Sequence, residues 1–505
     1  MTPRIDPGDV ERFRGAITRR FGLQMDDTKL AFLGELLARR LEATSQGRAV
    51  YLERLERASS PDEELRALAR ELTVSETYFF RGIDQLRAFS EVVLPSRLAA
   101  RSATRQLRIL SAGCASGEEP YSLAILLRAL GPGWDVSIRG VDLNPAVLQK
   151  AAQGRYSMWS LRETPADLQQ RWFRAQGSEH LLDESIRRAV EFEERNLAED
   201  DPRFWLPDHY DVVFCRNTLM YFTPESARAL VERISRSLSP GGFLFLGHAE
   251  TLRGLSQSFH LHHARDVFYY QRKLEGEAPR KPRSLSVPVP AVGAPREAYL
   301  GETPASWIET IDRASGRIQA LAARPARMTA AGPRDPDAAP SLELARELLE
   351  KERFADALEL LGGAPSGSQH DPDVLLLRAA LLSHSGRFDA AEQVCKQLLE
   401  LDELNAGAHY LLALGAEARG DPDGAIDHDQ VASYLDPAFA MPRLHLGLLA
   451  RRKGQPEAAR RDLARAYWLL QREDASRLLL FGGGFGREAL VALCRAELVA
   501  SGGAP

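Results

Sequence analysis

The chain has 505 residues, enough for about three domains of average size. Hydrophobic residues make up 44% and charged residues 27%, which are ordinary proportions for a soluble globular protein and exclude wholesale disorder. The formal net charge of -5 excludes the chain-wide basic field that sequence-independent nucleic-acid binding requires.

Three further features bear on location and class. No apolar stretch approaches the ~20 residues that span a bilayer, and the N-terminus has no apolar signal core. The four cysteines form no CxxC pair, so neither a disulfide framework nor a zinc site is indicated. We therefore predict a cytoplasmic protein that does not insert into membranes, binds no nucleic acid and holds no metal.

The first part of the chain, residues 1–95, shows helical periodicity. Its clearest sign is a run of leucines spaced three and four apart between Leu30 and Leu41, which places one apolar stripe on a helix. In residues 96–275, short β-rich runs alternate with helix-length segments, a pattern typical of an α/β sheet. The sequence thus predicts an all-α domain followed by an α/β domain.

Residues 276–339 differ from both neighbours in composition. Ten of the chain's 29 prolines fall between 276 and 340, beside many alanines, glycines and serines, so we predict a linker. One stretch inside it, Trp307 to Leu321, has an amphipathic pattern. We predict a transient helix without a fixed docking site; the alternative is a helix that docks on another part of the protein.

The C-terminal part, residues 340–500, repeats itself. Alanines recur every 34 residues, at Ala357, Ala391, Ala425 and Ala459, and glycines keep the same interval at Gly386, Gly420 and Gly454. This period is typical of tetratricopeptide repeats, whereas a generic Ala/Leu-rich bundle has no fixed period. Small residues 12 positions before the last three alanines allow the two helices of a unit to pack closely: Ala379, Ala413 and Gly447. We predict repeats from 340 to about 472, followed by capping helices.

A glycine-bearing turn at 112–117 stands between a predicted strand and a helix. Such a turn lets the backbone approach a nucleotide-like cofactor. Asp142 follows Gly117 by 25 residues at the end of the next strand, where an acid binds two ribose hydroxyls. The alternative is that Asp142 caps the helix that begins near Asn144.

The charge of the following helix distinguishes between two cofactor classes. A dinucleotide places its pyrophosphate over the helix N-terminus, but Glu118 and Glu119 occupy that first turn and would repel phosphate. S-adenosylmethionine carries a sulfonium and an ammonium and no phosphate, so the acidic turn favours it. Which glutamate faces the ligand depends on where the helix starts and stays open.

Six motifs, taken in order, resemble the chemotaxis receptor methyltransferase (CheR) family over about residues 8–273. They are SETYFFR at 75–81, SAGCASGEEPYSLAI at 111–125, Asp142, Asn196-Leu197, CRN with MYF within 215–222, and GHAE at 247–250. The resemblance implies an all-α N-terminal domain and a class I (Rossmann-like) methyltransferase domain. It also implies S-adenosylmethionine-dependent methylation of glutamates on the helical cytoplasmic domains of chemoreceptors, giving methyl esters and S-adenosylhomocysteine.

The resemblance also implies a set of cofactor-binding residues: Ser75, Thr77, Arg81, Gly113, Gly117, Glu119, Asp142, Asn196, Leu197, Asn217 and Thr218. The family usually has Asn where this chain has Ser75, which puts that contact in doubt. Alternative roles are a helix cap for Thr77 and a loop-stabilising polar residue for Asn217. His248 follows a strand end and is predicted to be structural.

The expected nucleophile explains why no catalytic His/Cys constellation is needed. A glutamate side chain with a pKa of about 4.3 is ionised at neutral pH, so no base has to deprotonate it. The enzyme must supply geometry and exclude water. Arg81 and Tyr221 are the candidate catalytic residues that orient the carboxylate.

Partner surfaces are predicted in three places. Arg39 and Arg40, with Lys29 and Arg48 nearby, match a basic stretch used against acidic receptor helices, or form only a solvated helix face. A β-hairpin expected between Trp172 and Glu193 lacks the glycine expansion of peptide-binding members. The repeat groove is expected to bind a protein or peptide, with Tyr410 either lining it or packing in the core.

Two other function classes stay open. One is an inactive adaptor that only binds the cofactor, although the expected cofactor-binding residues are all present. The other is a class I methyltransferase acting on a small molecule or RNA, which the helical domain and the lack of basic–aromatic motifs disfavour.

Overall fold

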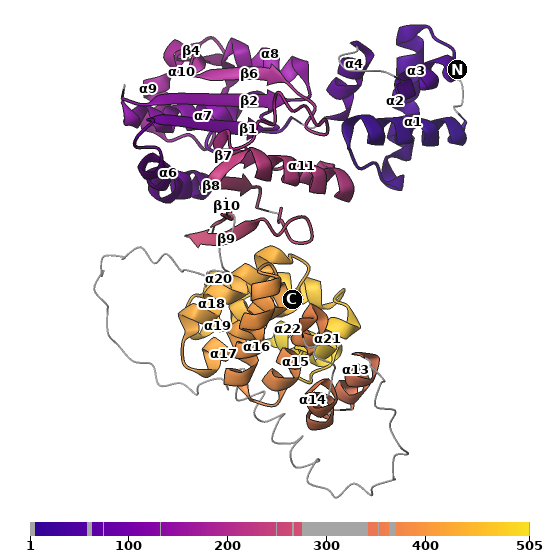
Figure 1. The fold of residues 1–505 in the computed structure, drawn as a ribbon, viewed down its shortest axis with the longest axis vertical. Helices are drawn as coiled ribbons and strands as arrows, with labels where there is room; N and C mark the ends of the chain where they lie inside the picture. Colours follow the sequence, from indigo (N-terminus) through magenta and orange to yellow (C-terminus); the bar gives the residue numbers. More distant parts are fainter. Residues whose placement is uncertain are drawn as a thin grey trace, which may run out of the picture. The chain divides into compact units, whose positions relative to one another are not determined.

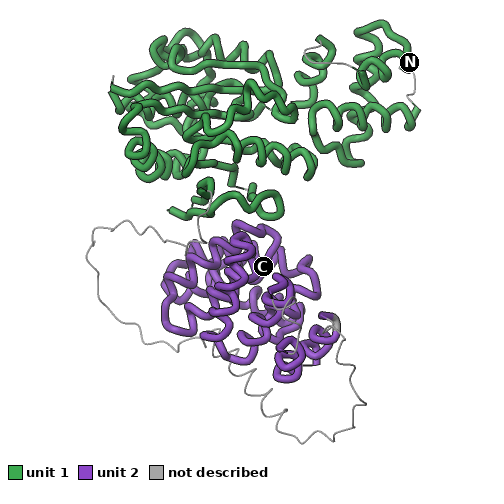
Figure 2. Tube along the Cα trace, in the orientation of Figure 1, with its two compact units in different colours: residues 1–285 green, residues 286–505 purple. Residues whose placement is uncertain are grey.

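The computed structural model describes residues 6–57, 63–73, 75–131, 133–248, 250–264, 267–274, 342–351, 353–362 and 370–503. The chain divides into two compact units, residues 1–285 and 286–505, which are described separately (Figure 2). The predicted linker at 276–339, with its helix at Trp307–Leu321, lies outside the described residues. In the described part of the chain, no helix has both the length and the apolar character to cross a membrane.

Four helices form the N-terminal domain around one apolar core (Figure 1): α1 (Pro7–Phe21), α2 (Leu30–Thr44), α3 (Arg48–Arg57) and α4 (Glu63–Leu72). The predicted leucine stripe is confirmed on α2. Leu33, Leu36 and Leu37 are fully buried, and Leu30 and Leu41 pack against the same core.

The buried residues of this core lie between Val10 and Ala69, and Leu72, Leu143 and Tyr221 pack against them. The next helical segments, α5 (Ile83–Ala88), the π-helix η2 (Phe89–Val93) and α6 (Leu94–Ala100), belong to the core of the sheet domain. The Phe89 ring, for example, lies 5.5 Å from the ring of Phe214 on a central strand. Periodicity identified these helices correctly but did not show which core their apolar face joins.

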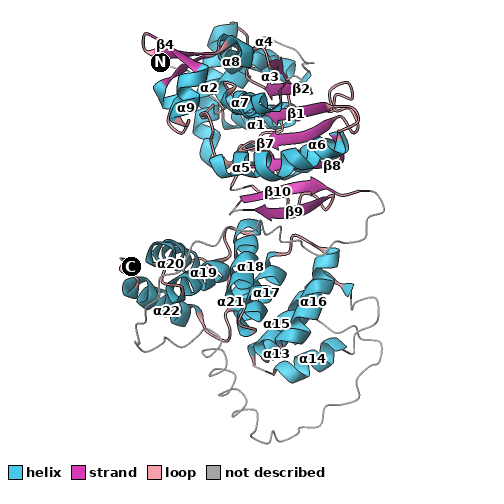
Figure 3. Ribbon diagram, turned by 90° about the vertical axis from the view of Figure 1, so that its left-hand side faces the viewer, coloured by secondary structure: helices cyan, strands magenta, loops and turns pink. Residues whose placement is uncertain are grey.

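A seven-stranded, mostly parallel sheet forms the centre of the second domain (Figure 3), with the strand order β6-β2-β1-β7-β8-β10-β9. Its parallel strands are β1 (Gln106–Ala112), β2 (Asp135–Asp142), β6 (Val190–Glu194), β7 (Tyr210–Cys215) and β8 (Leu238–Leu246). Strand β10 (Val267–Arg272) is antiparallel to β8 and to β9 (Phe259–Ala264). Helices α7 (Glu118–Leu127), α8 (Pro145–Gln153) and α11 (Pro224–Ser237) follow β1, β2 and β7.

The strand order places a binding crevice beside β1. The chain passes from β1 to β2 on one side, whereas β7 pairs with β1 on the other, so the strand order reverses there. Ligands of such sheets bind outside the carboxyl ends of the strands at this reversal. The helical domain lies at that same end of the sheet (Figure 1).

A small antiparallel sheet adjoins the main one, with β3 (Arg155–Ser157), β5 (Glu179–Leu182) and β4 (Phe173–Gln176) in that order. The hairpin formed by β4 and β5 lies where the sequence predicts one, after Trp172. It turns within two residues, Gly177 and Ser178, so it is short.

The described residues of the second unit form four helix pairs: α13 (Leu342–Glu350) with α14 (Phe354–Gly362), α15 (Pro372–His384) with α16 (Phe388–Leu401), α17 (Ala406–Ala418) with α18 (Pro422–Leu435), and α19 (Ala440–Arg452) with α20 (Pro456–Leu470). Helices α21 (Ala475–Phe481) and α22 (Arg487–Ala500) follow. This is the predicted repeat domain with its C-terminal helices.

The reason for the small residues of the repeat is visible in the packing. All four motif alanines are buried. A Cβ atom on Gly447 would lie 2.6 Å from Leu463 Cγ on the partner helix, so no larger residue fits. Tyr410 is fully buried against Phe439 and Phe481, which makes it a core residue and not part of a groove.

Candidate functional site

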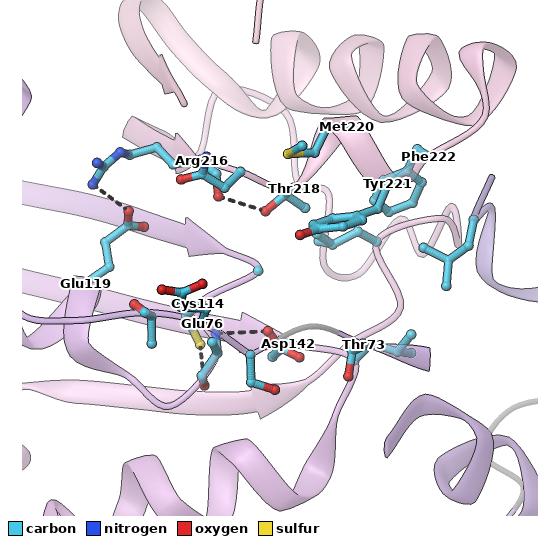
Figure 4. Close-up of a pocket in the computed structure, with 18 of the residues that line it drawn as sticks. Thr73, Glu76, Cys114, Glu119, Asp142, Arg216, Thr218, Met220, Tyr221 and Phe222 are labelled. Atoms are coloured by element: carbon cyan, nitrogen blue, oxygen red, sulfur yellow. Dashed lines mark hydrogen bonds and ion pairs between the residues drawn. The ribbon is translucent and has the colours of Figure 1, made fainter. Parts of the chain in front are cut away.

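A cavity of about 320 Å³ lies at the carboxyl ends of the parallel strands, where the helical and sheet domains meet (Figure 4). Its walls come from residues 21–29 after α1, the link at 72–81, the ends of β1 and β2, and the loops at 195–197 and 216–222. All of these residues belong to the first unit. The volume suits a small cofactor.

The turn after β1 brings the backbone close to the cavity at Gly113. Its φ is 78°, and a Cβ atom there would lie 2.4 Å from Thr218 Oγ1, so both the conformation and the space require glycine. The adjacent Asp142 lines the cavity and accepts hydrogen bonds from the backbone N–H groups of Ala115 and Asn144, each at 2.9 Å. Burial raises the pKa of Asp142, although these backbone donors oppose the shift.

The alternative role for Asp142 as a helix cap is excluded. Helix α8 is capped by Asn144, whose Oδ1 accepts the backbone N–H of Ala146 at 3.0 Å. The hydrogen bonds that Asp142 makes within the protein order the backbone around the turn. Its carboxylate therefore keeps acceptor capacity directed toward the cavity (Figure 4).

The start of α7 decides which of the two glutamates lines the cavity. Glu119 lines the cavity, whereas Glu118 is buried away from it and accepts a hydrogen bond from Ser116 at 2.8 Å. Glu119 accepts from Ser111 Oγ at 2.7 Å and forms a 3.1 Å ion pair with Arg216. Its carboxylate is thus fixed in orientation.

Gly117 lies in the same turn but does not line the cavity. It precedes α7 with a φ of 89°, and a Cβ atom there would meet Ala151 and Phe192 at 2.8 and 2.9 Å. Gly117 thus lets helix and strand pack closely, and its predicted contact with the cofactor stays a prediction.

The link between the domains contributes Ser75, Thr77 and Arg81 to the cavity wall. Thr77 does not cap a helix, since α5 begins at Ile83 and Gly82 precedes it. Arg81 donates a hydrogen bond to the backbone carbonyl of Glu76 at 2.9 Å.

The loop after β7 is held by one carboxylate. Glu250 accepts backbone N–H groups from four residues, at 2.6 to 3.2 Å: Asn217, Thr218, Met220 and Gly247. Asn217, which has a φ of 54°, is thereby kept in an uncommon conformation, and its side chain lines the cavity together with Thr218. Thr218 and Tyr221 lie on one side of the cavity and Asp142 on the other (Figure 4).

Asn196 and Leu197 both line the cavity, as predicted from the resemblance. Asn196 is already engaged, because its Nδ2 donates to the carbonyl of Arg20 in the helical domain at 2.7 Å. Its second role is therefore to join the two domains around the site.

Cysteine or metal chemistry receives no support from the described side chains. Burial, together with the charges of Asp142 and Glu119, raises the pKa of the Cys114 thiol well above its usual range, so it stays protonated. Among the described residues, no three His, Cys, Asp or Glu side chains form a group that could hold a metal ion. Burial also lowers the pKa of His248, which does not line the cavity.

The predicted docking arginines differ from one another. Arg40 forms a 2.6 Å ion pair with Glu64, a nearly buried carboxylate that also accepts from Tyr51 at 2.7 Å. Arg40 is thus tied to the core of the helical domain and is not part of a free basic face. Arg39 is half exposed and forms a 3.0 Å ion pair with the exposed Glu71.

The charges and shape of this cavity fit S-adenosylmethionine. Glu119 and Asp142 provide carboxylates for a cationic ligand that also has ribose hydroxyls, Gly113 allows close approach of the backbone, and the acidic first turn of α7 disfavours phosphate. A parallel sheet with this site at its strand reversal defines the class of S-adenosylmethionine-dependent methyltransferases with a Rossmann-like fold.

Comparison with known proteins identifies the family. Residues 75–268 match the family model described as CheR methyltransferase, SAM binding domain, and residues 348–415 match a tetratricopeptide repeat model. A relative named chemotaxis protein methyltransferase 2, from Vibrio cholerae, is 37% identical over 286 residues, which cover 55% of this chain and 97% of that protein. A relative from Pseudomonas putida, named probable biofilm formation methyltransferase WspC, is 30% identical over 473 residues, covering 90% of this chain and 97% of that protein. The chain belongs to the CheR methyltransferase family and carries a tetratricopeptide-repeat region.

Sequence reasoning missed several residues of the cavity wall. Arg216 is the most consequential, because besides pairing with Glu119 it donates to the carbonyl of Arg81 at 2.7 Å. Its place inside the CRN motif was a signal that it has a role. Met25 and Lys29, which reach the cavity from the helical domain, stand in no motif and are identified only by the fold.

Proposed function

We propose that this protein methylates glutamate side chains of a chemoreceptor-type protein, with S-adenosylmethionine as the methyl donor. The observation that carries the proposal is the cavity itself, in which Asp142 and Glu119 lie together with Arg81 and Tyr221. The relatives' names, which refer to chemotaxis and to biofilm formation, support a receptor protein as substrate.

The cofactor supplies an electrophilic methyl group on a sulfonium. The roles of the chain's own residues follow from charge and position. Asp142 accepts hydrogen bonds from ribose hydroxyls, Glu119 attracts the ammonium, and Leu197 contributes apolar wall area on the adenine side. Because Arg216 fixes Glu119 and the backbone at Arg81, it is a positioning residue for both the cofactor and the substrate side of the cavity.

The substrate glutamate needs orientation and not deprotonation, since it is ionised at neutral pH. Arg81, which lines the cavity, provides a positive charge for that carboxylate. The Tyr221 hydroxyl provides a hydrogen-bond donor (Figure 4). Holding a carboxylate oxygen in line with the methyl–sulfur bond, in a cavity shielded by the helical domain, accounts for catalysis by proximity and exclusion of water.

Two paired measurements distinguish the proposed receptor methylation from an inactive adaptor and from a methyltransferase with another substrate. Calorimetric titration with S-adenosylhomocysteine tests the cofactor site, and radiolabelled methyl transfer to receptor cytoplasmic fragments tests the reaction. We expect both to succeed. Binding without transfer to any receptor fragment would favour the adaptor, and transfer only to RNA or small molecules would favour the other methyltransferase class.

For the repeat domain we propose recruitment or regulation through a protein or peptide partner, without a part in methyl transfer. Every residue of the cavity wall lies between Phe21 and Phe222, in the first unit. A tether of about 60 residues has an r.m.s. span of at least roughly 40 Å if flexible, so a tethered domain can raise the local substrate concentration. A fragment ending near residue 275 should keep near-normal turnover with saturating free substrate but methylate receptors less in cells. Loss of turnover by a folded fragment would contradict this role.

A further inference from the structure

Two large apolar side chains are exposed to solvent directly after β3. Met158 and Trp159, on the 3₁₀-helix η4 (Met158–Leu161), are 57% and 68% exposed. Adjacent exposed residues of this size are unfavourable in water and are enriched where proteins bind other proteins.

The Trp159 indole is connected to the cavity wall by stacked side chains. The Arg162 guanidinium carbon lies 4.3 Å from the centroid of the Trp159 ring and 3.6 Å from that of the Tyr78 ring, so Arg162 is sandwiched between them. Arg162 is further fixed by donating to the Trp159 carbonyl at 2.8 Å. Tyr78 lines the cavity, and the Arg81 guanidinium carbon is 5.7 Å from its ring centroid.

This arrangement makes a rigid, amphipathic surface that is continuous with the site. We call Met158, Trp159, Arg162 and Tyr78 the Trp159 patch. Stacking pre-organises the aromatic rings and the guanidinium, so little side-chain entropy is lost when a partner covers them. Glu76, the ion-pair partner of Arg162, is exposed and 4.0 Å away, which leaves the guanidinium able to meet an acidic group of a partner.

We propose that the Trp159 patch is a substrate-docking surface, and that it binds the apolar face of the amphipathic, acidic helix that carries the methylated glutamate. This proposal rests on the proposed function. Three successive stacking contacts, each shorter than 6 Å, connect the Trp159 indole to the Arg81 guanidinium. The indole and the guanidinium are therefore at most about three turns of an α-helix apart. A helix whose glutamate reaches Arg81 therefore places side chains within three turns, on the same face, over Met158 and Trp159.

The test compares Michaelis constants for a receptor cytoplasmic fragment, measured with the full-length protein. Trp159→Ala and Met158→Glu should each raise KM at least about fivefold while leaving kcat and the affinity for S-adenosylhomocysteine unchanged. Trp159→Phe, which keeps an aromatic ring, should have a KM close to that of the wild type. Trp468→Ala is the matched control, because Trp468 is likewise exposed and stacked by two arginines, Arg465 and Arg472, but belongs to the repeat unit.

Each other outcome has a distinct meaning. A wild-type KM for both Trp159→Ala and Met158→Glu overturns the docking surface and leaves the proposed function intact. A weaker affinity for S-adenosylhomocysteine in these variants also overturns it, since the patch then serves the cofactor pocket structurally. A wild-type enzyme that binds S-adenosylhomocysteine but methylates no receptor fragment contradicts the proposed function and this inference with it.

Discussion

Both units of the protein bury charged side chains, but they do so in different settings. In the sheet domain, Glu119 and Asp142 face a cavity, and Glu119 is balanced by Arg216. In the repeats, His445 lies 2.6 Å from Asp429 and 2.9 Å from Glu417, and all three side chains are sealed within packed helices.

The difference separates charge used for binding from charge used for packing. Burial alone would lower the pKa of His445, but Asp429 and Glu417 outweigh it and raise that pKa to about 10. The histidine is therefore a cation at neutral pH and joins α17, α18 and α19. The carboxylates near the cavity keep acceptor capacity for a ligand. Removing a charge should thus change stability in the repeats and ligand affinity in the sheet domain.

The largest effect is expected from His445→Ala. It leaves the fully buried Asp429 without its ion-pair partner, whereas Glu417 keeps its ion pair with Arg452. Breaking a comparable buried pair costs about 3–5 kcal/mol. Calorimetric unfolding of the full-length chain should show a destabilised repeat unit with unchanged affinity for S-adenosylhomocysteine. His409→Ala is the control: burial and His428 lower the pKa of His409 to about 3, so a neutral group is removed and the loss should be smaller. Equal losses of unfolding free energy in the two variants would show that the ion pairs of His445 add no stability beyond that of a buried neutral histidine.

Asp142→Ala should have the next largest effect, and on binding instead of stability. Losing a bidentate, charge-assisted contact is expected to weaken S-adenosylhomocysteine binding by at least ~2–3 kcal/mol. Calorimetric titration measures this loss directly. Glu179→Ala is the control, because it removes a carboxylate on β5 away from the cavity and should bind S-adenosylhomocysteine normally. If Asp142→Ala has the same affinity as the wild type, the assignment of Asp142 to the cofactor site is wrong.

The pH dependence of the repeat unit provides a third comparison. Because the pKa of His445 is raised from 6.5 to about 10 in the folded state, its contribution to stability is complete below pH 6.5 and is lost as the pH rises through 10. Unfolding free energy of the repeats should therefore fall between pH 7 and 10. In a His445→Gln variant, the unfolding free energy should lack this decrease with pH. A pH dependence equal to that of the wild type would contradict the assignment of a positive charge to His445.

The smallest effect is expected for an exposed charge in the helical domain. Arg39→Glu should weaken receptor methylation a few-fold at low salt, without changing stability or S-adenosylhomocysteine affinity, because an exposed charge acts on encounter with an acidic helix. Arg40→Glu should instead destabilise the helical domain by about 2 kcal/mol, since it opposes the buried Glu64. Equal turnover of the Arg39 variant and wild type at every salt concentration would show that Arg39 is only solvated.

Sequence patterns predicted most of the fold and of the cavity. The 34-residue period and the alternation of strand and helix segments follow from local sequence rules. The first predicted the repeat pairs, and the second predicted the sheet. The motifs at 75–81, 111–125 and 215–222 gave most of the predicted cofactor residues. The last two follow the ends of β1 and β7, and the first is the link between the domains.

What sequence could not give depends on contacts between distant segments. Glu118 and Glu119 are equivalent by position, and only the direction of α7 separates them. Gly117 and Arg40 carry the right residue types for binding, but their neighbours in space, Phe192 and Glu64, assign them to packing. Lys29 and Met25 join the site because the helical domain folds over it.

The central claim is that the cavity transfers a methyl group to a carboxylate, and one measurement tests it directly. Receptor cytoplasmic fragment is incubated with the full-length protein and S-adenosylmethionine labelled in the methyl group, and the labelled protein is then treated with alkali. Methyl esters release the label as volatile methanol, so we predict alkali-labile label on the receptor fragment and none with Asp142→Ala. Label that is stable to alkali, or equal labelling by Asp142→Ala, would contradict the account.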